Sequence, residues 1–247
     1  HVAGIAAAMR GNGLGIQGIA PNARIMVIRA VPDGDERDKD IANAIRYAVD
    51  NGARVVNMSF GKAYSPDKRL VDDAVRYADS RGVLLVHAAG NDGADLRSER
   101  NFPNRAFEGG GEADLWIEVG ASAPSLDSLA ASFSNYGNGR VDVFAPGVRI
   151  FSSVPANAYE SNQGTSMAAP VVTGLAALIL SYYPEFSAAE VRQVILDSAS
   201  PHRTRSVVRP GDDGGQVAFG ELSTTGGVVN AYAALKLAEE RSRSTRD

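Results

Sequence analysis

The chain contains no cysteine and no excess of positive charge, and each absence removes a class of function. Without cysteine there can be no disulfide, no Cys-ligated zinc or iron–sulfur cluster and no thiol nucleophile. With 25 Lys and Arg against 29 Asp and Glu, the net charge of −4 argues against a general nucleic-acid-binding protein. The three histidines are scattered, without the spacing of paired helical metal ligands. We therefore expect neither a nucleic-acid partner nor a metal centre built on such ligands.

Long apolar runs are also lacking, since none reaches the roughly 18 residues of a membrane helix. The longest, residues 167–180, is interrupted by Pro170, Thr173 and Gly174 and is typical of a buried helix, so we expect no membrane partner. At 247 residues the chain is long enough to bury a sizeable core without a disulfide or metal. No linker separates two cores, and we predict one domain over residues 1–247.

Short runs rich in Val and Ile alternate along the chain with amphipathic helical patterns, an order typical of parallel strands joined by helices. The predicted strands cover residues 24–30, 54–60, 82–89, 115–120 and 141–145. The predicted helices cover residues 1–9, 41–49, 70–78, 167–180 and 229–240, with another beginning at Ser187 as a capping box with Glu190. Because the strands are apolar throughout, we predict an α/β fold with a mostly parallel sheet and helices on both faces.

Two motifs look more informative than they are. Gly13, Gly15 and Gly18 spell G-x-G-x-x-G, but the dinucleotide fingerprint needs a strand before it and a helix after it. Here a helical pattern precedes the motif and a predicted strand follows, which favours a glycine-rich connector. An acidic stretch fits either a solvated turn or a structural calcium loop. Its members are Asp33, Asp35, Glu36, Asp38 and Asp40.

Three other positions carry polar groups where a reaction can use them. Ser166 begins the long apolar helix, either as an N-cap or as a nucleophile beside unpaired N–H groups. Asn91 follows a buried strand, either as a turn former or as an amide donor to an oxyanion. His1 opens a helix packed through small residues, either as a structural residue or as a base. Taken singly, each position leaves both options open.

Taken together, and in this order, the three segments resemble the subtilisin family of serine peptidases, the subtilases. The family carries its general base in H-G-T-H-V-A-G, its oxyanion asparagine in A-A-G-N and its nucleophile in G-T-S-M-A-x-P. This chain has H-V-A-G at residues 1–4, A-A-G-N at 88–91 and G-T-S-M-A-A-P at 164–170. The resemblance covers nearly the whole chain. Further matches are G-I-A-P-N-A at 18–23, V-V-N-M-S-F-G at 55–61, F-S-N-Y-G at 133–137, A-P-G at 145–147 and G-G-V-V-N-A at 226–231.

The resemblance implies a serine endopeptidase with a three-layer, subtilisin-like α/β fold. It makes Ser166 the nucleophile and His1 its general base, with Asn91 and the backbone N–H of Ser166 as the oxyanion hole. The partner is then a peptide or protein substrate, no cofactor is needed for the chemistry, and a secreted or periplasmic location is expected. The residues implied to flank the substrate and its first side chain are Ser59, Phe60, Gly61, Ala88, Ala89 and Gly90.

One feature of the family is missing, namely the catalytic aspartate that precedes the histidine. Every aspartate of this chain follows His1, and Asp40 and Asp92 lack the family's motif. We therefore expect an incomplete catalytic domain, with the aspartate and early strands supplied by an upstream segment of the same protein. The chain alone should have little activity, because removing that carboxylate costs on the order of 10⁴ in kcat in enzymes of this mechanism, subtilisins included. A non-catalytic module that binds extended peptide is the competing hypothesis.

Overall fold

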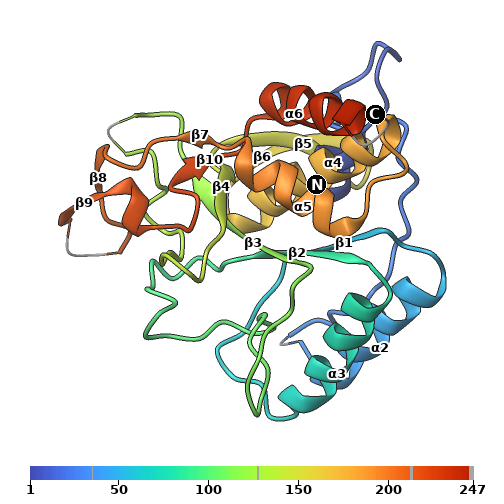
Figure 1. The fold of residues 1–247 in the computed structure, drawn as a ribbon, viewed down its shortest axis with the longest axis horizontal. Helices are drawn as coiled ribbons and strands as arrows, with labels where there is room; N and C mark the ends of the chain where they lie inside the picture. The colour runs from blue at the N-terminus through green and yellow to red at the C-terminus, as the bar shows by residue number, and fades with distance from the viewer. Residues whose placement is uncertain (35, 127, 212–213, 245–247) are drawn as a thin grey trace.

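A six-stranded sheet forms the centre of the fold in the computed structural model, which describes residues 1–34, 36–126, 128–211 and 214–244 (Figure 1). The strand order is β1-β2-β3-β4-β10-β7, with each pair from β1 to β10 parallel and only β7 antiparallel to its neighbour. The predicted mostly parallel α/β sheet is therefore confirmed. The strands are β1 (Val55–Met58), β2 (Leu84–Ala88), β3 (Trp116–Ser122), β4 (Val143–Pro146), β10 (Gly227–Val228) and β7 (Ser200–Pro201).

Helices cover both faces of the sheet, as the continuous apolar strands predict (Figure 1). Leu84 and Val86 of β2 point toward α4 (Thr165–Tyr182) and α5 (Ala188–Asp197), while Leu85 between them points toward the opposite layer. That layer consists of α2 (Asp38–Asp50) and α3 (Lys68–Ser80). The remaining elements are α1 (Val2–Ala7), β5 (Ile150–Val154), β6 (Ala158–Asn162), β8 (Ser206–Val208), β9 (Gln216–Ala218), the 3₁₀ turn Phe219–Glu221 and α6 (Ala231–Ser244).

A local sequence signal sets the beginning of α5. The side chain of Ser187 accepts a hydrogen bond from the Glu190 N–H, and the Glu190 carboxylate accepts one from the Ser187 N–H, so the predicted capping box is present.

α4 has the length and apolar composition of a membrane span, but Ala169, Val172 and Leu175 are buried against the sheet. α4 is therefore a central core helix of this fold, in agreement with the buried helix predicted at residues 167–180.

The predicted strand at residues 24–30 is not formed, and this prediction is wrong. The segment has no regular secondary structure, and no backbone hydrogen bond joins it to the described part of the chain. Ile25, Met26 and Val27 are exposed. A strand needs a neighbour to accept and donate its ladder bonds, and no described strand lies beside this segment. Its apolar residues therefore remain in contact with solvent.

Candidate functional site

Ser166 is the second residue of α4, at the end of the helix that faces the carboxyl ends of the strands. Its hydroxyl donates to the carbonyl of Ser59 at 3.2 Å, and the hydroxyl of Ser59 donates to the carbonyl of Ser166 at 2.9 Å. Pro170 is the sixth residue of α4 and therefore lies beyond its first turn. Pro170 has no N–H to donate to the carbonyl four residues earlier, and Ser59 supplies that bond to Ser166 instead.

Asn91 is tied to the beginning of α4 by one half of its amide group. Its Oδ1 accepts from the N–H of Thr165 at 2.8 Å and from the Thr165 hydroxyl at 3.1 Å. The N–H of Gly90 in turn donates to the Thr165 hydroxyl oxygen at 3.1 Å. Within the described residues, the Nδ2 of Asn91 has no hydrogen-bond partner, and the residue is exposed. The arrangement fixes the side chain through its oxygen and leaves its N–H₂ group available as a donor beside Ser166.

The two segments implied to flank a substrate lie on adjacent strands. Ser59, Phe60 and Gly61 follow the end of β1, while Ala88, Ala89 and Gly90 come from the end of β2. Ser59 and Phe60 are half-buried and Gly61 is exposed, whereas Ala88 and Ala89 are buried. The two segments therefore lie side by side at the ends of paired strands, and Ser59 is hydrogen-bonded to Ser166.

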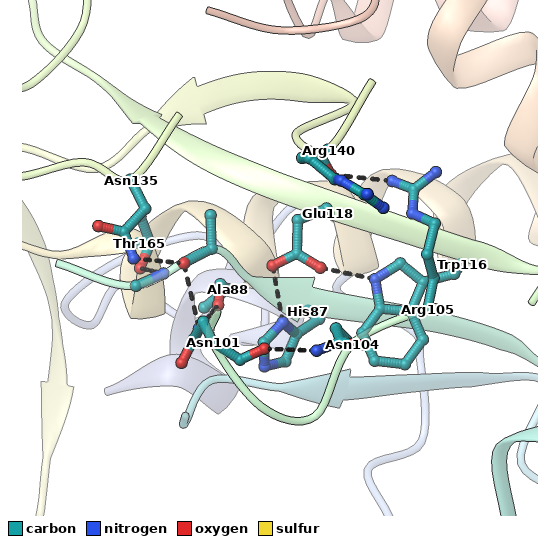
Figure 2. A network of polar contacts seen from close by, with 12 residues as sticks. His87, Ala88, Asn101, Asn104, Arg105, Trp116, Glu118, Asn135, Arg140 and Thr165 are labelled. Atoms are coloured by element: carbon teal, nitrogen blue, oxygen red, sulfur yellow. Dashed lines mark hydrogen bonds and ion pairs between the residues drawn. The ribbon is translucent and has the colours of Figure 1, made fainter. Parts of the chain in front are cut away.

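Asn101, which the sequence analysis missed, lies between these two segments (Figure 2). Its Nδ2 is 3.4 Å from the carbonyl oxygen of Ala88 and 3.1 Å from that of Ala89. A Cβ added to Gly61 would meet the Asn101 Oδ1 at 2.5 Å, and one added to Gly90 would meet its Nδ2 at 3.2 Å. The side chain thus fills the space between the two segments. It belongs to a polar loop without a motif, so no sequence signal could identify it.

Asn135 holds the loop that carries Asn91, and it gives the F-S-N-Y-G match at residues 133–137 a physical role. Its Oδ1 accepts from the N–H groups of Asp92 at 3.0 Å and Ala94 at 2.9 Å. Its Nδ2 donates to the carbonyl of Ala89 at 2.8 Å. The backbone N–H of Asn135 also donates to the carbonyl of Gly90 at 3.0 Å. One buried side chain therefore determines the path of residues 89–94.

His1 immediately precedes α1, and it is not joined to Ser166. Its Nε2 is 3.0 Å from the carbonyl oxygen of Ile150 and 3.1 Å from that of Glu160, so this nitrogen donates. Its Nδ1 is buried and has no partner among the described residues. No hydrogen bond connects His1 with Ser166 in the part of the chain that the structure describes. In this orientation the ring offers no free Nε2 lone pair to the serine.

Among the described residues, none of the acidic side chains considered for catalysis or calcium binding is hydrogen-bonded to His1 or Ser166. Asp92 accepts a hydrogen bond from Asn135 at 3.3 Å, Asp40 lies on α2, and Asp35 lies outside the described residues. Asp38 is buried, and its carboxylate pairs with Lys62 at 2.7 Å. The described residues contain no group of three or more His, Asp or Glu side chains placed to hold a metal ion.

The pKa of the Asp38 carboxyl shows how its surroundings compete. Burial raises the pKa, but hydrogen bonds from Lys62, the Asp67 N–H and the Ser65 hydroxyl outweigh that effect and lower it below its ordinary value. A carboxylate engaged in this way connects the start of α2 to the loop before α3. Asp38 therefore acts as a structural ion-pair partner in this fold.

Comparison with known proteins places this geometry among peptidases. Thermophilic serine proteinase of Bacillus sp. (strain AK1) is 45% identical over 200 residues, which are 81% of this chain and 46% of that protein. Subtilisin BL of Lederbergia lenta is 38% identical over 201 residues, which are 81% of this chain and 69% of that protein. A solved structure of proteases from Pseudoalteromonas arctica superposes with a TM-score of 0.77 at 28% identity, covering 96% of this chain and 70% of that one.

The sequence pattern of the subtilase family matches residues 1–227. The chain spans about half the length of several curated relatives, such as the 46% given above and 49% of an alkaline protease of Alkalihalobacillus alcalophilus. The match nevertheless extends from H-V-A-G at residues 1–4 to the closing G-G at 226–227 and includes the serine, asparagine and histidine segments. On its sequence, its sheet order and its structural neighbour, this chain belongs to the subtilase family.

Proposed function

We propose that the protein is a serine endopeptidase that cleaves peptide bonds through an acyl-enzyme on Ser166. The observation that carries the proposal is the junction of Asn91 with the beginning of α4, where the amide oxygen is used for positioning and the Nδ2 is left as a donor. The first N–H groups of a helix have no partner within the helix, so the N–H of Ser166 can donate to the same point. Two donors beside a serine hydroxyl are suited to a tetrahedral oxyanion.

The proposed reaction has two steps. The Oγ of Ser166 attacks the substrate carbonyl while its proton passes to His1, and the oxyanion accepts hydrogen bonds from Asn91 and the Ser166 N–H. The tetrahedral intermediate collapses, the C–N bond breaks, and His1 returns the proton to the leaving amine. Water, deprotonated by His1, then attacks the ester and frees Ser166. The substrate is a peptide or protein chain lying between residues 59–61 and 88–90, and no cofactor takes part.

We further propose that an upstream segment of the same protein supplies the carboxylate of the triad. The buried and unpartnered Nδ1 of His1 supports this proposal. A carboxylate at that nitrogen would fix the tautomer that carries the proton on Nδ1 and leave Nε2 with a lone pair for Ser166. The exposed Ile25, Met26 and Val27 are suited to pairing with a strand of such a segment. Export from the cell is proposed from family membership alone.

The test is the intact mass of the chain after incubation with a fluorophosphonate, with Ser166→Ala as the control. A single adduct that disappears in the control supports an assembled serine and oxyanion hole. Folded protein without an adduct would overturn the proposal for this chain and favour a subtilase-like module that binds peptide without cutting it. The lack of a hydrogen bond between His1 and Ser166 is the observation on which that second candidate rests.

A further inference from the structure

A buried His–Glu pair, His87 and Glu118, lies on β2 and β3, and the mechanism does not use it (Figure 2). The Nδ1 of His87 is 2.8 Å from the Oε1 of Glu118, and the two side chains are 0% and 5% exposed. The Nε1–H of Trp116 donates to the other carboxylate oxygen at 2.7 Å. Both oxygens of Glu118 are therefore engaged, and the carboxylate is held in one position.

The second ring nitrogen of His87 contacts the backbone of the segment at residues 59–61. Its Nε2 is 2.9 Å from the carbonyl oxygen of Phe60, which can only accept, so Nε2 carries a proton. Phe60 is also in edge contact with the ring, at 6.4 Å between the centroids. The chain of contacts runs from Trp116 through Glu118 and His87 to the backbone of the segment at residues 59–61.

The position of this contact in the sheet gives it a specific task. The ladder of β1 with β2 ends at the pair Met58–His87, and His87 is in turn paired with Glu118 of β3. Beyond Met58 the backbone leaves the ladder, and it is paired again only at the isolated bridge between Lys62 and Phe102, so the Phe60 carbonyl lies outside both pairings. The side chain of His87 provides a hydrogen bond at the point where the ladder ends.

Stability alone does not explain the pair. Burying two ionisable groups is expensive, and an apolar pair of similar volume is often as stable or more stable. The neighbouring positions on this face of the sheet, Leu85 of β2 and Trp116 of β3, are occupied by large side chains that pack in the apolar core. A buried polar pair at this place is thus consistent with a need to direct a hydrogen bond at the Phe60 carbonyl rather than to fill the core.

We propose that Glu118 and His87 are positioning residues that hold the Phe60 carbonyl and thereby position the segment at residues 59–61 for an extended peptide. The inference rests on the proposed function, because it assumes that residues 59–61 flank the substrate. Neither residue touches the reacting atoms. The pair acts through Phe60, which is adjacent to Ser59, the hydrogen-bond partner of Ser166.

A conservative substitution, Glu118→Gln, separates the effect of the hydrogen-bond geometry from that of the carboxylate charge. In Glu118→Gln the amide oxygen still accepts from Trp116 and the amide N–H₂ donates to the Nδ1 of a neutral His87, whose Nε2–H still donates to Phe60. All three hydrogen bonds survive. In His87→Leu the donor to Phe60 is lost, and in Glu118→Leu the ring loses the group that orients it.

The experiment measures the Kd of a fluorescein-labelled eight-residue peptide of alanine and leucine by fluorescence anisotropy, with Ser166→Ala in every protein to prevent cleavage. We expect His87→Leu and Glu118→Leu to raise the Kd about 10-fold, the scale of one hydrogen bond to a charged or buried group. Glu118→Gln should stay within about twofold, since conservative replacement restores the contact. Val191→Ala, a buried position in α5 outside both flanking segments, is the control for general destabilisation.

The outcomes separate the two proposals. The positioning role would be overturned if the Kd were unchanged in both leucine variants. It would also be overturned if Val191→Ala, compared at equal free energy of unfolding, raised the Kd as much as the leucine variants do. An increase of the Kd in Glu118→Gln as large as in Glu118→Leu would overturn it too. So would the finding that the reference protein, which carries only Ser166→Ala, binds no peptide. Fluorophosphonate labelling of the chain with Ser166 intact tests the peptidase proposal separately. If the chain is not labelled but the leucine variants bind the peptide more weakly, only the peptidase proposal is overturned.

Discussion

Replacing Asn135 by leucine should weaken both the fold and the reactivity of Ser166. Asn135 is 1% exposed, and leucine has nearly the same volume, so the substitution removes hydrogen bonds without opening a cavity. Four bonds are lost, to the N–H groups of Asp92 and Ala94, to the carbonyl of Ala89 and to the carboxylate of Asp92. The Ala89 carbonyl keeps its second bond, from Asn101. At about 1 kcal/mol for each bond, the free energy of unfolding should fall by about 4 kcal/mol.

The measurement is equilibrium unfolding in urea, together with the rate of fluorophosphonate labelling in the absence of urea. Labelling should slow, because residues 89–94 lose the anchor that places Asn91 beside Ser166. Asn138→Leu is the matched control: Asn138 is exposed and its side chain makes one hydrogen bond, to the carbonyl of Gly220 at 3.1 Å. A loss below about 1 kcal/mol in Asn135→Leu, or an equal loss in the control, would refute this account of the loop.

Three further predictions follow from single contacts. Asn91→Asp keeps an oxygen for both Thr165 bonds but loses the donor, so labelling should fall by about 10²-fold or more at unchanged stability, a magnitude measured on a subtilisin of this same family. Asp38→Asn should flatten the acid dependence of the melting temperature: the lowered pKa means that its stabilisation is complete above 3.8 and is lost as the pH falls below that value. Ser187→Ala removes the capping box with Glu190 and should cost about 1 kcal/mol in urea unfolding.

Local patterns predicted the layers of the fold because each pattern reports one element at a time. The 3.6-residue period of α2 and α3 and the continuous apolar runs of β2 and β3 indicated both the elements and the faces that they bury. β1, β2 and β4 are shorter than the apolar runs that predict them: residues 82–89 predict a strand that the structure begins at Leu84. An apolar run includes core residues beyond the ladder, and the ladder alone defines a strand.

The candidate site was predictable only where a motif places its residue on one element. Ser166 at the beginning of α4 is such a case. The contacts made by Asn101, Asn135 and the His87–Glu118 pair join segments that are 12 to 46 residues apart, and nothing periodic marks them. Their role depends on which strands become neighbours. Register, rather than composition, brings those side chains into contact.

Residues 24–30 provide a direct test of how far local pattern determines a strand. Four of the seven side chains are Ile, Met, Val and Ile at residues 25–28, a run as apolar as that of β2, yet the segment makes no ladder with the described strands. If pairing rather than propensity protects an amide, these N–H groups should exchange with deuterium close to the rate of an unfolded peptide, while those of Leu85 and Val86 exchange far more slowly. Hydrogen-exchange mass spectrometry resolves the two peptides. Protection of residues 25–28 equal to that of β2 would show that the segment has found a partner, such as a second copy of the chain, and repeating the measurement at tenfold lower protein concentration would identify that case by the loss of protection.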